Sequence, residues 1–212
     1  MFDAIAPRYD LVNRIMTFRM DVGWRRKAVA SLALPAGSTV LDLACGTGDL
    51  CRELAAHDLR AVGVDLSLGM LSAARTETPL VQADASGLPL PDGHVDGVTC
   101  GFALRNFTDL EAFLVEVGRV VRPGGRIVLL EVAEPENRLL RAGHAFYFGR
   151  VVPLIGGLLS DGAAYRYLPK SVAYLPEPPA LMAMIRRAGF PDASRRLLSG
   201  GISQLITGTR QP

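Results

Sequence analysis

The stretch Val40-Leu41-Asp42-Leu43-Ala44-Cys45-Gly46-Thr47-Gly48-Asp49-Leu50 decides the fold of this 212-residue chain. It has the pattern of a buried strand, a glycine loop and the first turn of a helix. Gly46 and Gly48 have no side chain, so a ligand can touch the backbone of the loop. The N–H groups that open the following helix favour a polar or negative group at the same place. We therefore predict a strand–loop–helix unit that holds a ligand.

Two further strands are expected to end in acids. Residues 60–65 end in Asp65, about twenty residues beyond the loop, where a ribose lies in nucleotide-binding units. A third short strand runs into Asp84 and Ala85. Any one of these acids could instead be a helix cap or a turn acid. Because the ends of parallel strands meet at one edge, we expect Asp42, Asp65 and Asp84 to contact one ligand.

The spacing of the glycines separates two classes of ligand. A dinucleotide site needs a third glycine to wrap a pyrophosphate, and this chain has Cys51 there. Asp42 precedes the loop, and an acid suits an ammonium group better than a phosphate. S-adenosylmethionine carries an ammonium, a ribose and an adenine but no phosphate. The residues therefore favour S-adenosylmethionine over a nicotinamide dinucleotide, with Asp42, Asp65 and Asp84 at its amino acid, ribose and adenine.

Strands and helices alternate along the chain, which predicts an α/β, Rossmann-like, mostly parallel sheet of seven strands. The last two strands read as an antiparallel hairpin across Ser199-Gly200-Gly201. The chain is predicted to be one domain, 1–212, with a helical lid at 1–34 and an inserted helical segment at 134–175. The expected strands are 38–44, 60–65, 79–83, 95–101, 126–133, 193–198 and 202–209. The expected helices are 48–56, 67–75, 108–120 and one that follows Pro178-Pro179 and ends near Ala188.

Composition excludes several classes of protein. A net charge of +2 argues against an extended nucleic-acid surface. The chain has no long apolar run that could span a bilayer and no secretory signal, which predicts a cytoplasmic protein. Three cysteines and three scattered histidines lack metal-ligand spacing, so no metal is expected and the thiols are predicted to be buried. Residues 1–37 carry a surplus of three positive charges, which reads either as a solvated helix face or as a rim that contacts an anionic membrane.

Four segments resemble the demethylmenaquinone/ubiquinone carbon-methyltransferase family of class I S-adenosylmethionine-dependent methyltransferases. They are Phe2-Asp3-x-x-Ala6-x-x-Tyr9-Asp10 with Asn13 and Trp24, Asp42 to Leu50, Phe102-x-Leu104-Arg105-Asn106, and Tyr165-Arg166-Tyr167-Leu168 with Ser171. They cover nearly the whole chain, and the first and the last two are specific to this family. The resemblance implies cofactor contacts at Thr47, Asp65, Asp84 and Ala85. The full set expected to bind the cofactor is Tyr9, Asp42, Gly46, Thr47, Gly48, Asp65, Leu66, Asp84, Ala85 and Gly101.

The chain departs from the family pattern at three positions. Gly101 stands where the family usually has serine, so a backbone contact can persist but a hydroxyl contact cannot. Ala103 stands where glycine is usual, and Arg150 where histidine is frequent. The last two positions are expected near the acceptor, so they bear on substrate identity more than on chemistry.

Methylation of a quinol ring carbon requires loss of a hydroxyl proton, since a phenol has a pKa near 10. Arg105 and Asn106 are the first candidates for the catalytic polar group, because a guanidinium can stabilise a developing phenolate. The alternative is that Arg105 pairs with a neighbouring acid and holds its loop. Tyr165, Arg166 and Tyr167 form the second candidate cluster, in which Tyr165 and Tyr167 are the catalytic candidates, with ordinary packing as the alternative. His144 is interpreted as a structural residue.

The leading hypothesis is methylation of a prenylated quinol, most simply demethylmenaquinol to menaquinol. Apolar residues between Phe146 and Leu159 would then line a channel for the isoprenoid tail, with core packing as the alternative. Two other hypotheses remain open: methylation of a soluble aromatic or secondary metabolite, and a non-catalytic subunit that only binds the cofactor. Peripheral contact with the inner face of the membrane and formation of a homodimer are also left open.

Overall fold

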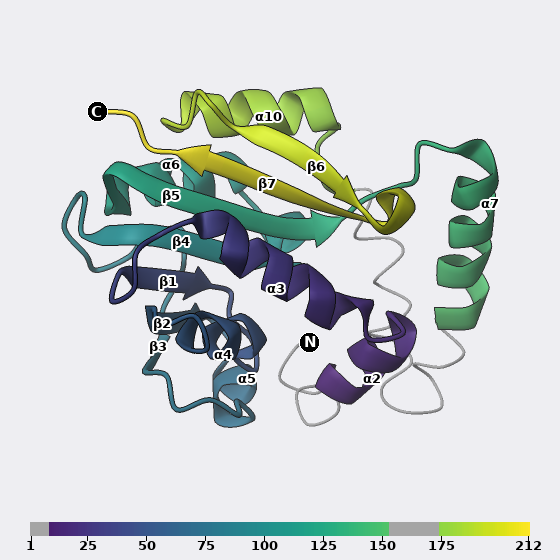
Figure 1. Ribbon diagram of the computed structural model, residues 1–212, viewed down its shortest axis with the longest axis horizontal. Helices are drawn as coiled ribbons and strands as arrows, with labels where there is room; N and C mark the ends of the chain where they lie inside the picture. The colour runs from purple at the N-terminus through teal and green to yellow at the C-terminus, as the bar shows by residue number, and fades with distance from the viewer. Residues whose placement is uncertain (1–8, 153–173) are drawn as a thin grey trace.

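A computed structural model describes residues 9–152 and 174–212. Its centre is a seven-stranded sheet in the order β3-β2-β1-β4-β5-β7-β6 (Figure 1). β1 to β5 pair in parallel, whereas β7 runs antiparallel to both β5 and β6. The strands are β1 (Thr39–Leu43), β2 (Arg60–Asp65), β3 (Leu80–Gln82), β4 (Val95–Gly101), β5 (Val121–Val132), β6 (Ser194–Leu198) and β7 (Ser203–Thr209).

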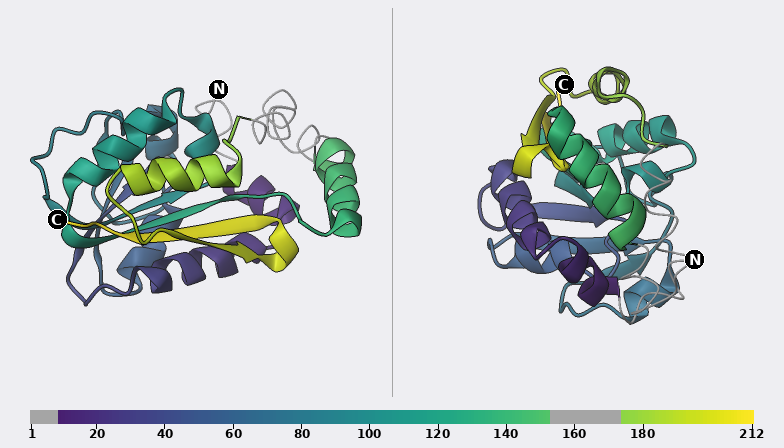
Figure 2. Two further views of the ribbon diagram at one scale, coloured as in Figure 1. Left: turned by 90° about the horizontal axis from the view of Figure 1, so that it is seen from above. Right: turned by 90° about the vertical axis from the view of Figure 1, so that its right-hand side faces the viewer.

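Helices cover both faces of this sheet (Figures 1 and 2). The helices α3 (Met20–Leu32) and α4 (Asp49–Ala55) lie on one face, and α6 (Leu110–Val120) and α10 (Pro178–Arg187) lie on the other. The short α5 (Leu68–Ser72) contacts β3. This three-layer arrangement is that of a doubly wound fold, as the alternation of strands and helices predicts.

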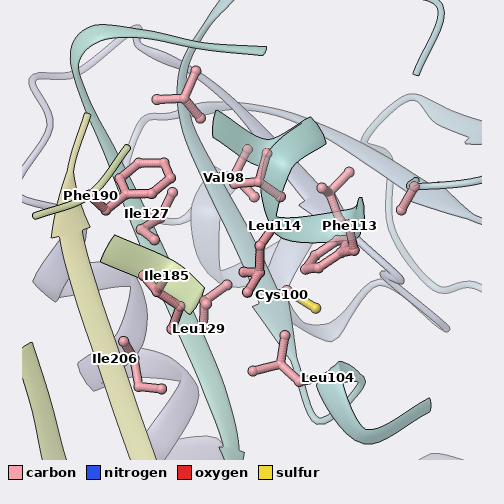
Figure 3. Close-up of a cluster of buried hydrophobic side chains, with 14 of the residues drawn as sticks. Val98, Cys100, Leu104, Phe113, Leu114, Ile127, Leu129, Ile185, Phe190 and Ile206 are labelled. Atoms are coloured by element: carbon pink, nitrogen blue, oxygen red, sulfur yellow. The ribbon is translucent and has the colours of Figure 1, made fainter. Parts of the chain in front are cut away.

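The alternation of side chains along β1 explains the two cores. Leu41 and Leu43 are buried with α6 and α10, whereas Val40 is buried with α3 and α4. Figure 3 shows the larger core, in which Phe113 and Leu114 of α6 and Ile185 of α10 meet the strands. A central parallel strand must be apolar toward both faces, which is why β1 reads as a continuous apolar run. Asp42 is the exception in that run.

The structure adds two details of local structure to the expected elements. Within the described part of the lid, α2 (Tyr9–Met16) and α3 are separate helices, because Phe18 and Arg19 turn the chain with φ of 51° and 62°. The strand expected at 126–133 begins earlier, at Val121, and its register against β4 shifts between Val95 and Gly97. A β-bulge adds residues to one strand without ending it. The sequence Pro123-Gly124-Gly125 therefore does not mark where β5 begins.

The described part of the inserted segment is helical, as expected. It contains α7 (Arg138–Phe146) and a π-helical turn, η3 (Tyr147–Val151). Asn137 caps α7, its side chain accepting from the backbone N–H groups of Leu139 and Leu140. α7 stands beyond the ends of β5 and β7 (Figure 1). The division of one domain into a lid at 1–34 and a cap at 134–175 stays a prediction.

Candidate functional site

Two cavities meet at the carboxyl ends of the parallel strands. The first, here the β2 cavity, has a volume of about 640 Å³ and lies at the ends of β2, β3 and β4. The second, the α7 cavity, has about 500 Å³ and lies between the end of β1, the helices α2 and α3, and α7. Ala44, Gly46, Gly101 and Phe102 line both. A single ligand that crosses this shared wall would therefore contact both cavities.

The glycine loop shapes the entrance between them. Gly46 and Gly48 have φ of 56° and 81°, in the left-handed region that favours glycine. A Cβ on Gly48 would lie 2.7 Å from Cγ2 of Thr76, whereas a Cβ on Gly46 would meet nothing within 4 Å. Gly48 is therefore required by packing. Gly46 faces open space, so a ligand can approach the loop closely at this position.

Asp65 and Asp84 are positioned by backbone N–H groups. Asp65 accepts 2.7 Å and 2.8 Å hydrogen bonds from the N–H groups of Gly46 and Ser67, one on each carboxylate oxygen. Asp84 accepts from the N–H of Ser86 at 2.8 Å. A carboxylate has about four lone-pair sites, so both acids keep acceptor capacity toward the β2 cavity. This arrangement suits the hydroxyls of a ribose and the amine of an adenine.

Asp42 is the least solvated of the three predicted acids. It is 1% exposed and accepts from the Thr99 hydroxyl at 2.9 Å and the Cys51 thiol at 3.4 Å. Burial raises the pKa of Asp42 to about 7, although the two hydrogen bonds and the positive charge of Arg25 oppose the rise. Asp42 lines the α7 cavity beside the loop. An ammonium group there would favour the ionised carboxylate.

Arg105 is held by a buried ion pair. Its guanidinium contacts Glu131 of β5, which is fully buried, and donates a 2.7 Å hydrogen bond to the carbonyl oxygen of Phe102. Phe102 has a φ of 60°, so this contact stabilises a backbone conformation that favours glycine. Arg105 still lines the α7 cavity. The alternative considered from the sequence, pairing with a neighbouring acid, is therefore what the structure shows, and a direct role in catalysis stays a prediction.

The lid helices are tied to the loop by charge. Arg25 of α3 contacts Asp21 at 2.5 Å and Asp49 at 3.0 Å, and its guanidinium lies 5.9 Å from the centre of the Phe102 ring. Trp24 donates from its indole nitrogen to the Ser199 hydroxyl at 2.8 Å. These contacts fix α3 against Asp49 and Ser199, both of which line the α7 cavity.

The predicted site residues divide between the two cavities. Leu66, Asp84 and Ala85 line the β2 cavity with Asp65, and Thr47 lines the α7 cavity with Asp42. Asn106 lines the β2 cavity, so the structure does not bring it together with Arg105. Gly48 supports the loop without lining either cavity in the described part of the chain. Tyr165, Tyr167 and the side chain of Tyr9 lie outside the described residues.

Three residues of the site escaped the sequence reasoning. Arg25 was counted only as part of a basic surplus, and His144, interpreted as structural, lines the α7 cavity. Glu131 was not singled out at all. The sequence does contain a signal for Glu131, because this charged residue directly follows the apolar run Ile127-Val128-Leu129-Leu130.

Other expectations from composition concern cysteines, metals and membrane spans. Cys45, Cys51 and Cys100 are buried, as predicted. Among residues 9–152 and 174–212, no cluster of three or more His, Cys, Asp or Glu side chains could hold a metal ion. Over the same residues, every helix is too short or too polar to cross a bilayer.

The chain is similar to known methyltransferases over almost its full length. Residues 1–210 match a family described as the ubiE/COQ5 methyltransferase family. A protein of Thermus thermophilus named demethylmenaquinone methyltransferase is 44% identical, over 99% of this chain and 100% of its own length. A protein of Syntrophotalea carbinolica named ubiquinone/menaquinone biosynthesis C-methyltransferase UbiE is also 44% identical, over 99% of this chain and 92% of its own.

Solved structures show the same fold at low identity. A SAM-dependent methyltransferase from Thermotoga maritima superposes with a TM-score of 0.69 at 19% identity, over 99% of this chain and 98% of its own. This similarity confirms the predicted Rossmann-like class I fold, with its antiparallel final hairpin.

Proposed function

Since this chain belongs to the ubiE/COQ5 methyltransferase family, we propose that it methylates a ring carbon of a prenylated quinol, with S-adenosylmethionine as the methyl donor. The simplest acceptor is demethylmenaquinol, because relatives that align with the whole chain carry the name demethylmenaquinone methyltransferase. The structural observation that carries the proposal is the shared wall of the two cavities. It puts a nucleoside-sized site and an apolar site on either side of Gly46 and Gly101.

The residues of the β2 cavity fit the nucleoside of the donor. Asp65 and Asp84 can accept from ribose hydroxyls and from the adenine amine, and Leu66 and Ala85 offer apolar walls. On the other side of the wall, Asp42 suits the ammonium of the methionine part, and the open space beside Gly46 leaves room for its carboxylate. The donor supplies a sulfonium methyl that is transferred by in-line displacement. The chain therefore has to align the two reactants and exclude water.

The lining of the α7 cavity fits a hydrophobic acceptor. Met16, Leu139, Leu140 and Phe148 contribute apolar surface around the few charged groups. Of the residues predicted to line a tail channel, Phe148 lines this cavity, Val152 packs against Val12 and Met16, and Phe146 is exposed. Leu154, Ile155, Leu158 and Leu159 lie outside the described residues. An apolar cavity with few converging polar groups is the ordinary form of a small-molecule site.

Arg105 is the proposed electrostatic partner of the acceptor. Glu131 holds the guanidinium of Arg105 in place. The guanidinium therefore does not have to reorient when negative charge develops on a quinol oxygen. Its bond to the Phe102 carbonyl also fixes the wall between donor and acceptor. A guanidinium stays protonated, which means that Arg105 can stabilise a phenolate but cannot take its proton.

The test is a labelled-methyl assay with a panel of quinols reduced in situ. The panel holds matched rings with and without an isoprenoid tail, and product mass and proton NMR give the acceptor and the methylated carbon. Methylation of the tailed naphthoquinol ring is the expected result. Equal activity on tail-less rings would favour a soluble aromatic or secondary metabolite. Binding of the donor without product on any ring would favour a non-catalytic subunit.

Contact with a membrane is part of the proposal, because a prenylated quinol resides in the bilayer. Leu11, Phe18, Leu139 and Phe146 are large apolar side chains exposed on the lid and on α7. We expect co-sedimentation with anionic vesicles that weakens in Leu139→Asp, and no such change in Val115→Asp, an exposed position on α6. Cytoplasmic localisation, with contact at the inner face of the membrane, stays a prediction, and so does a homodimer.

A further inference from the structure

The carboxylates that line the α7 cavity already have partners. Asp21 accepts from the Thr17 hydroxyl at 2.6 Å and pairs with Arg25. Asp49 pairs with Arg25 and with Arg52 of its own helix. Asp42 accepts from the hydroxyl of Thr99 on β4 and from the thiol of Cys51 on α4. Each of these carboxylates of the described chain is therefore already held by a donor or a cation.

Tyr147 and His144 are neutral side chains that line the same cavity. The Tyr147 hydroxyl donates to the carbonyl oxygen of Met16 at 3.0 Å, and burial raises its pKa. His144 also lines the cavity, and its Nε2 atom is buried without a hydrogen-bond partner among the described residues. Its ring packs against Phe148 with centroids 4.4 Å apart, which fixes the orientation of the imidazole. A buried polar atom without a partner costs free energy, so its presence in a cavity points to a ligand.

We propose that Nε2 of His144 is the base that takes the hydroxyl proton of the bound quinol; this inference rests on the proposed function. As the O–H bond breaks, its electron pair moves into the ring, and the adjacent carbon forms a bond to the donor methyl. The bond from that methyl to sulfur breaks, and its electrons stay on sulfur as a neutral thioether. The methylated carbon then loses its own hydrogen as a proton, and His144 returns its proton to the oxygen. The net reaction releases one proton.

The surroundings of His144 favour the neutral imidazole, which is the form that can accept a proton. Burial lowers its pKa, and the negative charge of Glu134 only partly opposes that effect. The other charged groups lining the cavity are Asp21, Arg25, Asp42, Asp49 and Arg105, and each has a partner of its own. The lowered pKa favours neutral His144, and the neutral tautomer with hydrogen on Nδ1 would present a lone pair at Nε2. A phenol is a much weaker acid than an imidazolium, so the proton moves together with formation of the carbon–carbon bond.

His144→Gln tests the assignment, with His57→Gln as the matched control, because His57 is exposed in the turn after α4 and lines neither cavity. His144→Gln should lower kcat about 10²- to 10⁴-fold, with an unchanged Kd for S-adenosylmethionine. Wild-type kcat should fall as pH drops through the pKa of His144. In the variant this acidic limb should vanish, and the rate should rise with pH toward the phenol pKa of about 10. Added imidazole should restore part of kcat in His144→Ala.

A second measurement does not depend on turnover. The chain has three histidines, so NMR titration of labelled imidazoles resolves each, and His144→Gln identifies its own signal. A tailed quinone, bound with S-adenosylhomocysteine, should shift the His144 signal and leave that of His57 in place. Full kcat with an intact acidic limb in His144→Gln would overturn the inference while leaving the methyltransferase proposal standing. Absence of quinol methylation by the wild-type protein would instead remove the proposed function itself.

Discussion

The backbone N–H of Gly46 donates a 2.7 Å hydrogen bond to a carboxylate oxygen of Asp65, which ties the loop after β1 to the acid that ends β2. The two residues are 19 positions apart, and the parallel pairing of β1 with β2 brings them together. One acid thereby fixes the loop and still faces the β2 cavity. Loop geometry and nucleoside contact are thus coupled through a single side chain.

The first prediction concerns Gly46. Gly46→Ala puts a methyl group into open cavity space and strains a φ of 56°. Gly37→Ala is the matched control, because Gly37 has a φ of 81° and equally open surroundings but lies outside both cavities. Each variant should lose about 1 kcal/mol of stability. Only Gly46→Ala should weaken donor binding in calorimetry, and equal affinities in the two variants would contradict the assignment of the loop.

The second prediction concerns Asp65. Asp65→Ala removes a charged acceptor for the ribose and releases the Gly46 N–H. A hydrogen bond to a charged group contributes about 1.5–3 kcal/mol, so the Kd for S-adenosylmethionine should rise about 10- to 100-fold. Glu77→Ala removes an exposed carboxylate near β3 and should leave the Kd unchanged. If the Asp65 variant bound the donor like wild type, the ribose would have to lie elsewhere.

The third prediction separates the two roles of Arg105. Arg105→Met leaves Glu131 buried without its cation and should cost about 3–5 kcal/mol of stability. Adding Glu131→Gln removes the unpaired charge while keeping an acceptor for the N–H of Val132, so the double variant should regain much of the loss. If Arg105 stabilises the acceptor, turnover should stay low in the stable double variant. Recovered turnover would show that Arg105 only holds its loop.

The fourth prediction is a pH effect on stability. Burial raises the pKa of Asp42 from 3.8 to about 7, so the folded protein holds a proton that the unfolded chain releases between these values. The free energy of unfolding should therefore fall as pH rises through this window, by about 1.4 kcal/mol per pH unit. Asp42→Asn lacks this dependence. Urea unfolding at about pH 5 and about pH 8 measures this effect. Between these pH values the free energy of unfolding of Asp42→Asn should rise relative to that of wild type, and equal changes in the two proteins would contradict the raised pKa.

The sequence by itself determined the strands, their mostly parallel direction and the place of the acids, whereas the order of the strands in the sheet came from the structure. Apolar runs specify buried strands, and β2 and β4 match their predicted bounds because Gly, Pro and acidic residues flank them. Once two strands are parallel, their carboxyl ends share an edge, so the acids at 65 and 84 had to meet there. The separation of α2 from α3 escaped this reasoning, because helical spacing continues across a two-residue break.

Only the tertiary structure decided which side chains face one another. Arg105 and Glu131 are 26 positions apart, and Trp24 and Ser199 are 175 apart. Local spacing carries no information about such pairs, since they depend on how the helices pack on the two faces and on the register of β4 with β5. The same is true of His144, whose helix reaches the cavity from beyond the sheet. The sequence thus determined where a ligand would bind, whereas the packing of the helices determined which polar side chains of the site face that ligand.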